Sequence, residues 1–264
     1  RKKIKKIKKQ KKIFNLKDQN KIISKLKFKL TNDQTKALIE INKDLNSPNK
    51  MFRLLQGDVG SGKTIVSLLA ALNCINSGFQ VAFMAPTEIL ARQHYNLAKN
   101  LFAKNISLDL LSSKSESKVK KETLKRLIDN KIDLIFGTHA IFQTKVRFQK
   151  LGLVIIDEQH KFGVNQRKRL SDKGGDNCDV LLMSATPIPR TLTMTIYGDM
   201  DLSIIREKPK SRKPVITYSK LDSKLDEVLK FIKKEIKNDN QVFWVCPLIE
   251  ESKKIDHASA VAKY

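Results

Sequence analysis

Cysteine is scarce in this sequence, and its three cysteines lie far apart. Cys74, Cys178 and Cys246 form no Cys-x-x-Cys pair, and an odd number cannot pair completely. A secreted domain held by disulfides, or a zinc site built on paired cysteines, would show clustered and even-numbered cysteines. We therefore expect reduced, mostly buried thiols, and neither a disulfide framework nor a zinc site.

Long hydrophobic runs are also missing. No stretch approaches the ~20 apolar residues that a membrane-spanning helix needs, and no apolar segment follows the basic N-terminal residues as it would in a secretory signal. These absences predict a cytoplasmic protein without membrane contact. Hydrophobic residues still make up 41% of the 264 residues, which is enough for a sizeable core.

Acidic residues are the third deficit. Asp and Glu number 27 against 52 Lys and Arg, which leaves a net charge of +25 at pH 7. Residues 1–30 hold fourteen of the basic residues, with Asp18 as the one acid there. This excess indicates a polyanionic partner, and nucleic acid fits better than a membrane because few apolar residues accompany the lysines. The alternative is that an AT-rich gene accounts for part of the excess, as the many Asn, Ile and Lys residues also suggest.

Against these absences stands a complete G-x-x-x-x-G-K-[ST] phosphate loop at residues 57–64. An apolar run at 51–55 precedes it and another at 65–72 follows, which is the strand–loop–helix context that such a loop needs. Its backbone N–H groups would surround a polyphosphate. We expect nucleoside-triphosphate binding by the whole loop, with Lys63 at the β- and γ-phosphates and Thr64 on Mg²⁺. The loop residues are Gly57, Asp58, Val59, Gly60, Ser61, Gly62, Lys63 and Thr64.

Short apolar runs alternate with helical stretches through the middle of the chain. This alternation predicts an α/β fold with a mostly parallel sheet covered by helices on both faces. Thr31 is expected to cap a helix that runs through Leu45. The expected strands are 51–55, 81–85, 108–111, 132–136, 153–156 and 180–183, and the expected helices are 63–76, 87–102, 117–130, 163–171 and 189–196.

Two adjacent acids, Asp157 and Glu158, end the apolar run at 153–156. Strand ends in a parallel sheet deliver side chains to the crevice where a phosphate loop lies. We therefore predict that Asp157 holds Mg²⁺, and that Glu158 orients and deprotonates the water that attacks the γ-phosphate. The alternative is that the two acids merely cap the following helix.

The chain divides into three parts by composition. Residues 1–29 form a basic linking segment, which we expect to be helical because Ile4, Ile7, Lys11 and Phe14 follow helical spacing. Residues 30–207 form the main domain. Residues 208–264 begin with a proline-flanked linker, followed by a strand at 215–218, an amphipathic helix at 225–236 and a strand at 241–249. Since these elements cannot bury a core alone, we expect a fragment of a longer protein.

The acids belong to a longer pattern. Asp157-Glu158-Gln159-His160 is followed by Phe162-Gly163-Val164 and by Ser184-Ala185-Thr186-Pro187-Ile188-Pro189-Arg190-Thr191. Together with the phosphate loop, these segments resemble superfamily 2 helicases, and more narrowly the RecG-type helicases that remodel branched DNA at stalled replication forks. The resemblance implies a RecA-like P-loop NTPase lobe at 30–207, the truncated start of a second RecA-like lobe at 208–264, and ATP-driven movement on forked DNA.

The resemblance also implies roles for individual residues. Gln34 would read the adenine base, since an amide offers both a donor and an acceptor. Two strand-to-helix turns would grip the phosphate backbone of DNA, and a hydroxyl-bearing segment would couple them to the γ-phosphate. The turns are Pro86-Thr87-Glu88 and Gly137-Thr138-His139, and the coupling segment is Ser184-Ala185-Thr186. A metal pair of His139 and His160 is a weaker interpretation, because the chain has only four histidines.

Three alternatives remain open from the sequence. A transcription-repair coupling translocase shares most of these segments but typically has Glu where this chain has Gln159. A P-loop kinase of small molecules would not need Ser184-Ala185-Thr186, and a binding module without catalysis would not need both Lys63 and Glu158. Because helicases of this kind take arginines from their second lobe, we expect this chain alone to hydrolyse little ATP. We also expect a monomer, and the sequence indicates no protein partner.

Overall fold

The structure is a computed structural model, and it describes residues 8–13, 16–102, 106–112, 117–158, 173–186, 200–207 and 215–245. The chain separates into two compact units, residues 1–212 and residues 213–264.

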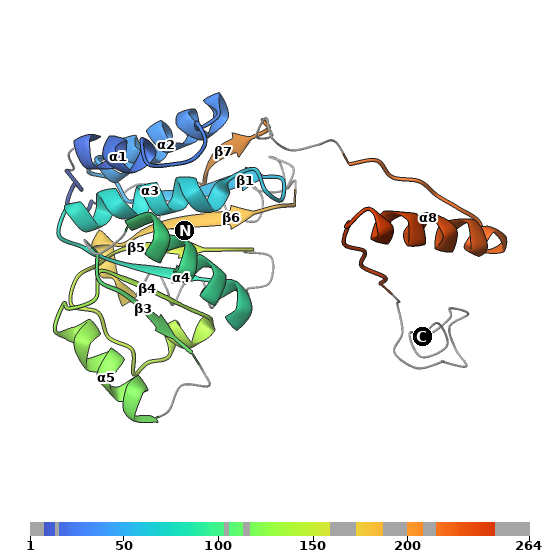
Figure 1. Ribbon diagram of the computed structural model, residues 1–264. Helices are drawn as coiled ribbons and strands as arrows, with labels where there is room; N and C mark the ends of the chain where they lie inside the picture. Colours follow the sequence, from blue (N-terminus) through green and yellow to red (C-terminus); the bar gives the residue numbers. More distant parts are fainter. Residues whose placement is uncertain are drawn as a thin grey trace. The chain divides into compact units, whose positions relative to one another are not determined.

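A seven-stranded sheet forms the centre of the first unit, with the strand order β3-β4-β2-β5-β6-β1-β7 (Figure 1). Every pair of neighbouring strands runs parallel. The parallel arrangement predicted from the apolar runs is therefore confirmed. The strands are β1 Phe52–Gly57, β2 Gln80–Met84, β3 Leu108–Leu111, β4 Leu134–Gly137, β5 Leu151–Ile156, β6 Asp179–Ser184 and β7 Asp201–Ile205.

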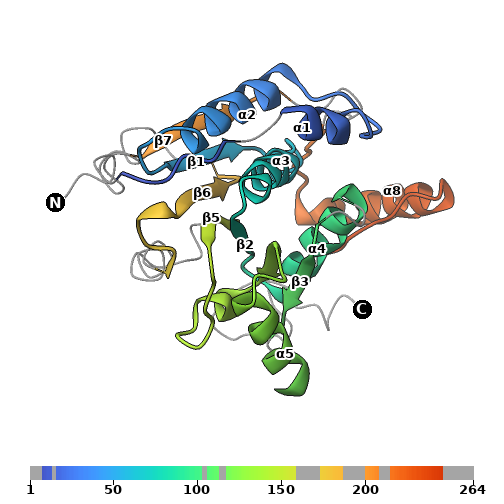
Figure 2. The same cartoon turned by 90° about the vertical axis from the view of Figure 1, so that its left-hand side faces the viewer.

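Side chains of the central strands alternate between two hydrophobic clusters, one on each face of the sheet. In β2, Val81 and Phe83 belong to one cluster and Ala82 and Met84 to the other. The first cluster also contains residues of α2, α3 and α4, whereas the second contains Leu127 of α5. Figure 2 shows the same layers from the side. The helices are α1 Leu16–Ile23, α2 Asn32–Leu45, α3 Lys63–Asn76, α4 Glu88–Phe102 and α5 Ser117–Ile128.

The helix α2 begins where the sequence predicted it to begin. Thr31 is its N-cap, and its hydroxyl accepts the Gln34 N–H while the Gln34 side chain accepts the Thr31 N–H. This reciprocal capping box satisfies two of the backbone donors that a helix leaves open at its start. The expected helix from Thr31 to Leu45 is confirmed.

The edge strand β7 was not predicted. Its residues alternate between buried and exposed, with Ser203 and Ile205 buried and Ile204 38% exposed. The expected strands were runs of mostly apolar residues, which is the pattern of strands buried on both faces. An edge strand beside β1 is covered less completely, so it lacked that pattern.

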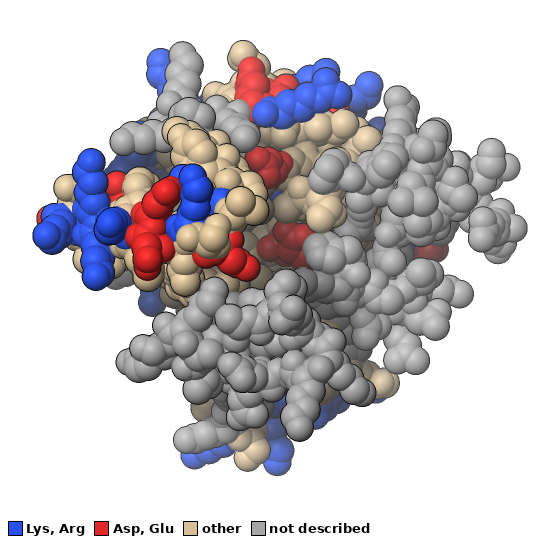
Figure 3. All heavy atoms as spheres, turned by 90° about the vertical axis from the view of Figure 1, so that its right-hand side faces the viewer, with Lys and Arg blue, Asp and Glu red and all other residues tan. Residues whose placement is uncertain are grey.

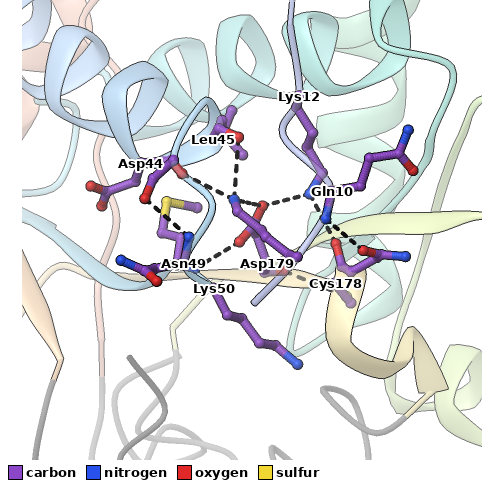
Figure 4. Close-up of polar contacts among 12 residues, drawn as sticks. Gln10, Lys12, Asp44, Leu45, Asn49, Lys50, Cys178 and Asp179 are labelled. Carbon is purple, nitrogen blue, oxygen red and sulfur yellow. Dashed lines mark hydrogen bonds and ion pairs between the residues drawn. The ribbon is translucent and has the colours of Figure 1, made fainter. Parts of the chain in front are cut away.

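The basic N-terminal segment does not form the continuous helix that was expected. Residues 8–13 form no helix, Lys8 makes a β-bridge with Asn49, and the helix α1 begins at Leu16. Lys9 and Lys12 are buried rather than exposed, and both ammonium groups contact the Asp179 carboxylate. Figure 4 shows Lys12 and Asp179 pointing toward one another at the start of β6.

Backbone contacts also hold this N-terminal strap, defined as residues 8–13, against the domain. Its Lys9 and Lys12 N–H groups donate to the carbonyls of Pro48 and Leu45. The Gln10 N–H donates to the Asn177 side chain at 2.8 Å. The strap therefore forms part of the domain's base, at the end of the sheet opposite to the carboxyl ends of the strands.

The second unit contains one long helix among its described residues, α8 Leu225–Lys237. The expected helix is confirmed there. The strand expected at 215–218 is wrong, because these residues form no strand in the structure and Val215 is 78% exposed. Of the strand expected at 241–249, residues 241–245 form no strand, and the remainder lies outside the described residues.

Three further expectations can be compared with the structure. Cys74 and Cys178 are free and buried, as predicted, whereas Cys246 lies outside the described residues. The helices expected at 163–171 and 189–196 also lie outside them. No helix in the described ranges is long and apolar enough to cross a membrane.

Candidate functional site

The predicted site residues share one edge of the sheet. Because all strands are parallel, the segments that follow them emerge together at their carboxyl ends. In spatial order, Gly137-Thr138-His139 follows β4, Pro86-Thr87-Glu88 follows β2, Asp157-Glu158 follows β5, Ser184-Ala185-Thr186 follows β6, and the phosphate loop follows β1. Backbone hydrogen bonds continue across this edge, from the Asp157 N–H to Met84 and from the Ala85 N–H to Gly137.

The phosphate loop has the backbone that its glycines predict. Gly60 and Gly62 have φ angles of 76° and 89°, in the left-handed region that favours glycine. Gly62 is the N-cap of α3, and no side chain caps that helix. The buried Ser61 hydroxyl has no hydrogen-bond partner among the described residues. Open N–H groups at a helix start, beside a buried unpaired hydroxyl, suit an anionic ligand such as a phosphate.

Lys63 folds back over the loop. Its ammonium group donates to the carbonyl oxygens of Gly57 at 2.6 Å and Asp58 at 3.1 Å. Burial lowers the pKa of Lys63, while the charges of Glu158 and Asp157 act in the opposite direction. The two predicted acids are therefore close enough to Lys63 for their charges to act on it. Since a triphosphate would also favour the charged ammonium, the site suits such a ligand.

Gln34 is held by the protein at both ends of its amide. Its Oε1 accepts the Thr31 N–H at 2.9 Å, and its Nε2 donates to the Ser61 carbonyl at 2.7 Å. The side chain is buried and joins the start of α2 to the phosphate loop. The adenine-reading role that the resemblance implied stays a prediction. What the structure adds is a direct link from Gln34 to the loop that would hold the phosphates.

Asp157 has both carboxylate oxygens engaged. Oδ1 accepts the Glu158 N–H at 3.1 Å, and Oδ2 lies 2.9 Å from Nε2 of His94 on α4. Glu158 has a φ of 51°, which is uncommon for a residue with a side chain and typical of functional sites. Sequence reasoning missed His94. A single histidine inside a helix has no accompanying pattern, and only the packing of α4 against the sheet brings it to Asp157.

The predicted DNA-contacting turns take ordinary cap and turn geometry. The Thr87 hydroxyl accepts the Leu90 N–H at the start of α4. Glu88 contacts the Ser112 hydroxyl beyond β3, so its carboxylate faces the protein. Thr138 is the N-cap of the short helix η2, His139–Phe142, and His139 is exposed. Both turns lie at the carboxyl edge of the sheet, and their contact with DNA stays a prediction.

The segment after β6 forms a local hydroxyl pair. The Ser184 and Thr186 hydroxyls lie 2.9 Å apart, and the Thr186 N–H donates to the Ser184 hydroxyl at 3.2 Å. Ser184 is buried, Ala185 is half-buried and Thr186 is exposed. The segment lies between the phosphate loop and Asp157-Glu158 in strand order. Its coupling role stays a prediction.

The residues expected to hold Mg²⁺ fit that ion chemically. The Asp157 carboxylate and the Thr64 hydroxyl are oxygen donors at the same sheet edge, and Mg²⁺ prefers oxygen ligands. No group of three or more His, Cys, Asp and Glu residues that could hold a metal occurs among the described residues. Because Mg²⁺ usually binds through one or two protein groups plus substrate phosphates and water, that finding is compatible with the predicted role. His160, of the weaker metal pair, lies outside the described residues.

The surface charge is spread rather than gathered on the face that Figure 3 draws. In that view, Lys and Arg side chains occupy several separate places, with Asp and Glu side chains among them. The described residues of this face carry no single continuous basic patch.

Comparison with protein families gives one match over most of the first unit. The model of the DEAD/DEAH box helicase family matches residues 31–195. This range contains the phosphate loop, the segments after β2, β4 and β5, and the hydroxyl segment after β6. All five segments at the sheet edge therefore fall inside the family match.

Curated relatives are 50% identical to this chain over the aligned residues. The ATP-dependent DNA helicase RecG of Bacillus subtilis is 50% identical over 252 residues, which are 95% of this chain and 37% of that protein. The RecG of Borreliella burgdorferi is 50% identical over 237 residues, 89% of this chain and 34% of that protein. The chain thus spans about a third of the length of these relatives.

Among solved structures, RecG bound to a three-way DNA junction resembles this chain with a TM-score of 0.79. The two are 42% identical in sequence, and the match covers 89% of this chain and 32% of that one. The DNA-bound helicase MrfA matches with a TM-score of 0.63 at 18% identity, and this likeness concerns the fold alone.

Proposed function

We propose, from the premise that this chain belongs to the DEAD/DEAH box helicase family, that it is the ATP-binding lobe of an ATP-driven helicase acting on branched DNA. One observation carries the proposal: five loops with complementary chemistry lie on one sheet edge in the order β4, β2, β5, β6, β1. Phosphate-binding groups lie at one end of that order, and the candidate DNA-contacting turns lie at the other.

The β1 end of the edge would bind and activate ATP. The α3 N-terminus and Lys63 would hold the phosphates, and Gln34, which donates to the Ser61 carbonyl, would keep the loop in place and recognise the adenine. Thr64 and Asp157 would hold Mg²⁺, which would neutralise charge on the β- and γ-phosphates. Glu158 accepts the proton of the attacking water.

The β2 and β4 end would contact the phosphate backbone of one DNA strand. Thr87 and Thr138 would offer hydroxyls and backbone N–H groups to the phosphates. The Ser184 and Thr186 hydroxyls, which lie between the two ends, would change partners when the γ-phosphate is lost. ATP turnover would then alter the grip on DNA.

The preference for branched DNA rests on the relatives. A RecG structure that this chain matches at 42% identity is bound to a three-way DNA junction. We extend that substrate class to the whole protein of which this chain is the ATP-binding lobe. We also propose that the protein works as a monomer in the bacterial cytosol. Hydrolysis would require arginines from a second motor lobe, which are worth ~10³–10⁵ in rate in comparable enzymes.

The first test concerns nucleotide binding by this chain. A fluorescent ATP analogue titrated in the presence of Mg²⁺ should bind, and Lys63→Ala should weaken binding at least about tenfold, as the loss of one charge-assisted contact does. Lys125→Ala, which removes an exposed lysine of α5, is the matched control and should bind as the unaltered chain does. Equal binding by both variants would contradict the assignment of the loop.

The second test concerns catalysis. A form of the protein that includes the second motor lobe should hydrolyse ATP faster with forked DNA than with linear duplex of the same length. Glu158→Gln should retain nucleotide binding and abolish hydrolysis. The chain alone should bind DNA with an affinity that falls as salt rises. Hydrolysis that survives Glu158→Gln, or no preference for forked DNA, would overturn the corresponding part of the proposal.

A further inference from the structure

His94 makes the contact that joins α4 to the candidate nucleotide site. Its Nε2 lies 2.9 Å from Oδ2 of Asp157, and the two side chains are only 10% and 12% exposed. The imidazole also packs on the Phe83 ring of β2, with 4.8 Å between ring centroids. The histidine is therefore fixed by a hydrophobic contact on one side and points its nitrogen at the carboxylate.

The direction of the hydrogen bond follows from the chemistry of the two groups. An ionised carboxylate has no hydrogen to give, so Nε2–H of His94 is the donor and Asp157 Oδ2 the acceptor. The other oxygen, Oδ1, accepts the Glu158 N–H. Because each oxygen has its own donor, the carboxylate plane of Asp157 is held in one orientation.

The same helix begins at the turn that is expected to contact DNA. Thr87 caps α4, and His94 lies seven residues further along the same helix, a rise of about 10 Å. A displacement of the Thr87 end would thus move His94. A movement of His94 would alter the hydrogen bond from its Nε2–H that orients the Asp157 carboxylate.

We propose that His94 is a positioning residue: it orients the Asp157 carboxylate toward Mg²⁺-nucleotide and couples that carboxylate to the DNA-contacting end of α4. The inference rests on the proposed function, because it takes Asp157 as a magnesium ligand and the Thr87 turn as a DNA contact. Partners that orient metal-ligating side chains commonly account for 10- to 100-fold in metal affinity.

The first measurement compares how tightly this chain binds the ATP analogue in the presence of Mg²⁺ and in the presence of a chelator. The quantity of interest is the ratio of these two affinities. His94→Phe keeps a ring on Phe83 but removes the donor, so the ratio should fall by about tenfold while the affinity in chelator stays unchanged. His94→Gln, whose amide can still donate, should retain more of the ratio. Tyr95→Phe, a change on the same helix that keeps the ring contact with Phe136, is the control.

The outcomes separate a positioning role from a structural one. If His94→Phe weakens binding equally with and without Mg²⁺, the residue only supports the fold, and the proposal is overturned. An unchanged ratio overturns it as well. In an Asp157→Asn background, His94→Phe should have no further effect on the ratio, since its action passes through that carboxylate. If His94→Phe does not fold, as judged by circular dichroism, the comparison of His94→Gln with the Asp157→Asn double variant decides the question.

The second measurement addresses coupling. Binding of Mg²⁺-nucleotide should change the affinity for single-stranded DNA by a factor that equals the effect of DNA on the nucleotide affinity. In His94→Phe this factor should move toward one, whereas DNA affinity without nucleotide should stay unchanged. A factor equal to that of the unaltered chain would refute the coupling. Failure of the unaltered chain to bind Mg²⁺-nucleotide would instead count against the proposed function.

Discussion

The ammonium group of Lys12 lies 2.6 Å from Oδ2 of Asp179, and both side chains are completely buried. Lys9 contacts the same oxygen at 2.5 Å, so two ammonium groups share one carboxylate. The other oxygen of Asp179 accepts the Met51 N–H at the start of β1. This contact fastens the N-terminal strap to the ends of two central strands. Although they belong to the basic N-terminal segment, these two lysines are therefore buried and turned toward the protein.

Asp179→Asn should destabilise the protein strongly. The change leaves two buried ammonium groups without a counter-charge, and removal of one partner of a buried ion pair costs about 3–5 kcal/mol. Lys12→Met should cost less, because Asp179 then keeps Lys9 and the Met51 N–H. Urea denaturation gives both values. Lys11→Met, at an exposed strap position, is the control and should stay within about 0.5 kcal/mol of the unaltered protein. A cost for Asp179→Asn no greater than that of the control would contradict the assignment.

Gln34→Glu should impair nucleotide binding by releasing the phosphate loop. A carboxylate can still accept the Thr31 N–H, but it cannot donate to the Ser61 carbonyl. The lost donor leaves a buried acceptor unsatisfied, at a cost of about 1–3 kcal/mol, which corresponds to roughly tenfold or more in affinity for the ATP analogue.

Gln80→Glu is the matched control for this variant. Gln80 is also a buried amide whose Nε2 donates to backbone carbonyls, those of Leu127 and Ile132, but it lies at the start of β2, away from the loop. Gln80→Glu should therefore lower the stability of the protein without changing its nucleotide affinity. Equal effects of the two changes on affinity would show that Gln34 acts only through stability.

Gly62→Ala should lower the stability of the protein more than Gly78→Ala does, although both glycines have a positive φ. An L-residue at such an angle costs about 1–2 kcal/mol in either position. At Gly78 an added Cβ meets nothing within 4 Å, whereas at Gly62 it collides with the Gln34 amide. Thermal unfolding should therefore rank the two variants, and only Gly62→Ala should also lose binding of the ATP analogue. Similar unfolding temperatures would indicate that the Gln34 contact contributes little.

The buried thiols should resist alkylation in the folded protein. Burial raises the pKa of Cys178 to about 12 and raises that of Cys74 further, from an ordinary value of 9.0. Iodoacetamide, followed by mass spectrometry in a Cys246→Ser background, should label neither cysteine until urea unfolds the chain.

The raised pKa values of the two thiols also make the stability of the protein depend on pH. Because the folded thiols bind their protons more tightly than the unfolded ones, their contribution is complete below pH 9 and is lost progressively as the pH rises toward 12. The free energy of unfolding should fall with pH over that window, and Cys178→Ala should reduce the slope. Rapid labelling of Cys178 in the native state at pH 8 would contradict its burial.

The central strands could be predicted because they are buried on both faces. Such strands are mostly apolar runs, and each of the six expected runs overlaps a strand in the structure. The edge strand β3 was predicted as well because three of its four residues are leucines, whereas the edge strand β7 has a mixed sequence, Asp-Leu-Ser-Ile-Ile, and was not. The strand expected at 215–218 failed for the converse reason: its residues favour an extended chain, but a strand also needs a neighbouring strand to accept its hydrogen bonds.

The candidate site was predictable to the extent that its chemistry is local. The phosphate loop and the pair Asp157-Glu158 are contiguous patterns whose residue types follow from phosphate and metal binding. His94 and Asp157 are 63 positions apart, and Lys12 and Asp179 are 167 apart. No periodicity or spacing connects such pairs, so only the folded chain brings them together.

The sequence by itself determined the parallel α/β architecture, the phosphate loop and the acids that face it, because each depends on residues adjacent along the chain. The tertiary structure decided how these parts are joined. It placed the five loops on one edge, connected Gln34 to the loop and His94 to Asp157, and turned two lysines of a basic segment into buried ion-pair partners. The physical reason is that a charge or a hydrogen-bonding group acquires its role from what surrounds it after folding, and the burial of the sheet sets those surroundings.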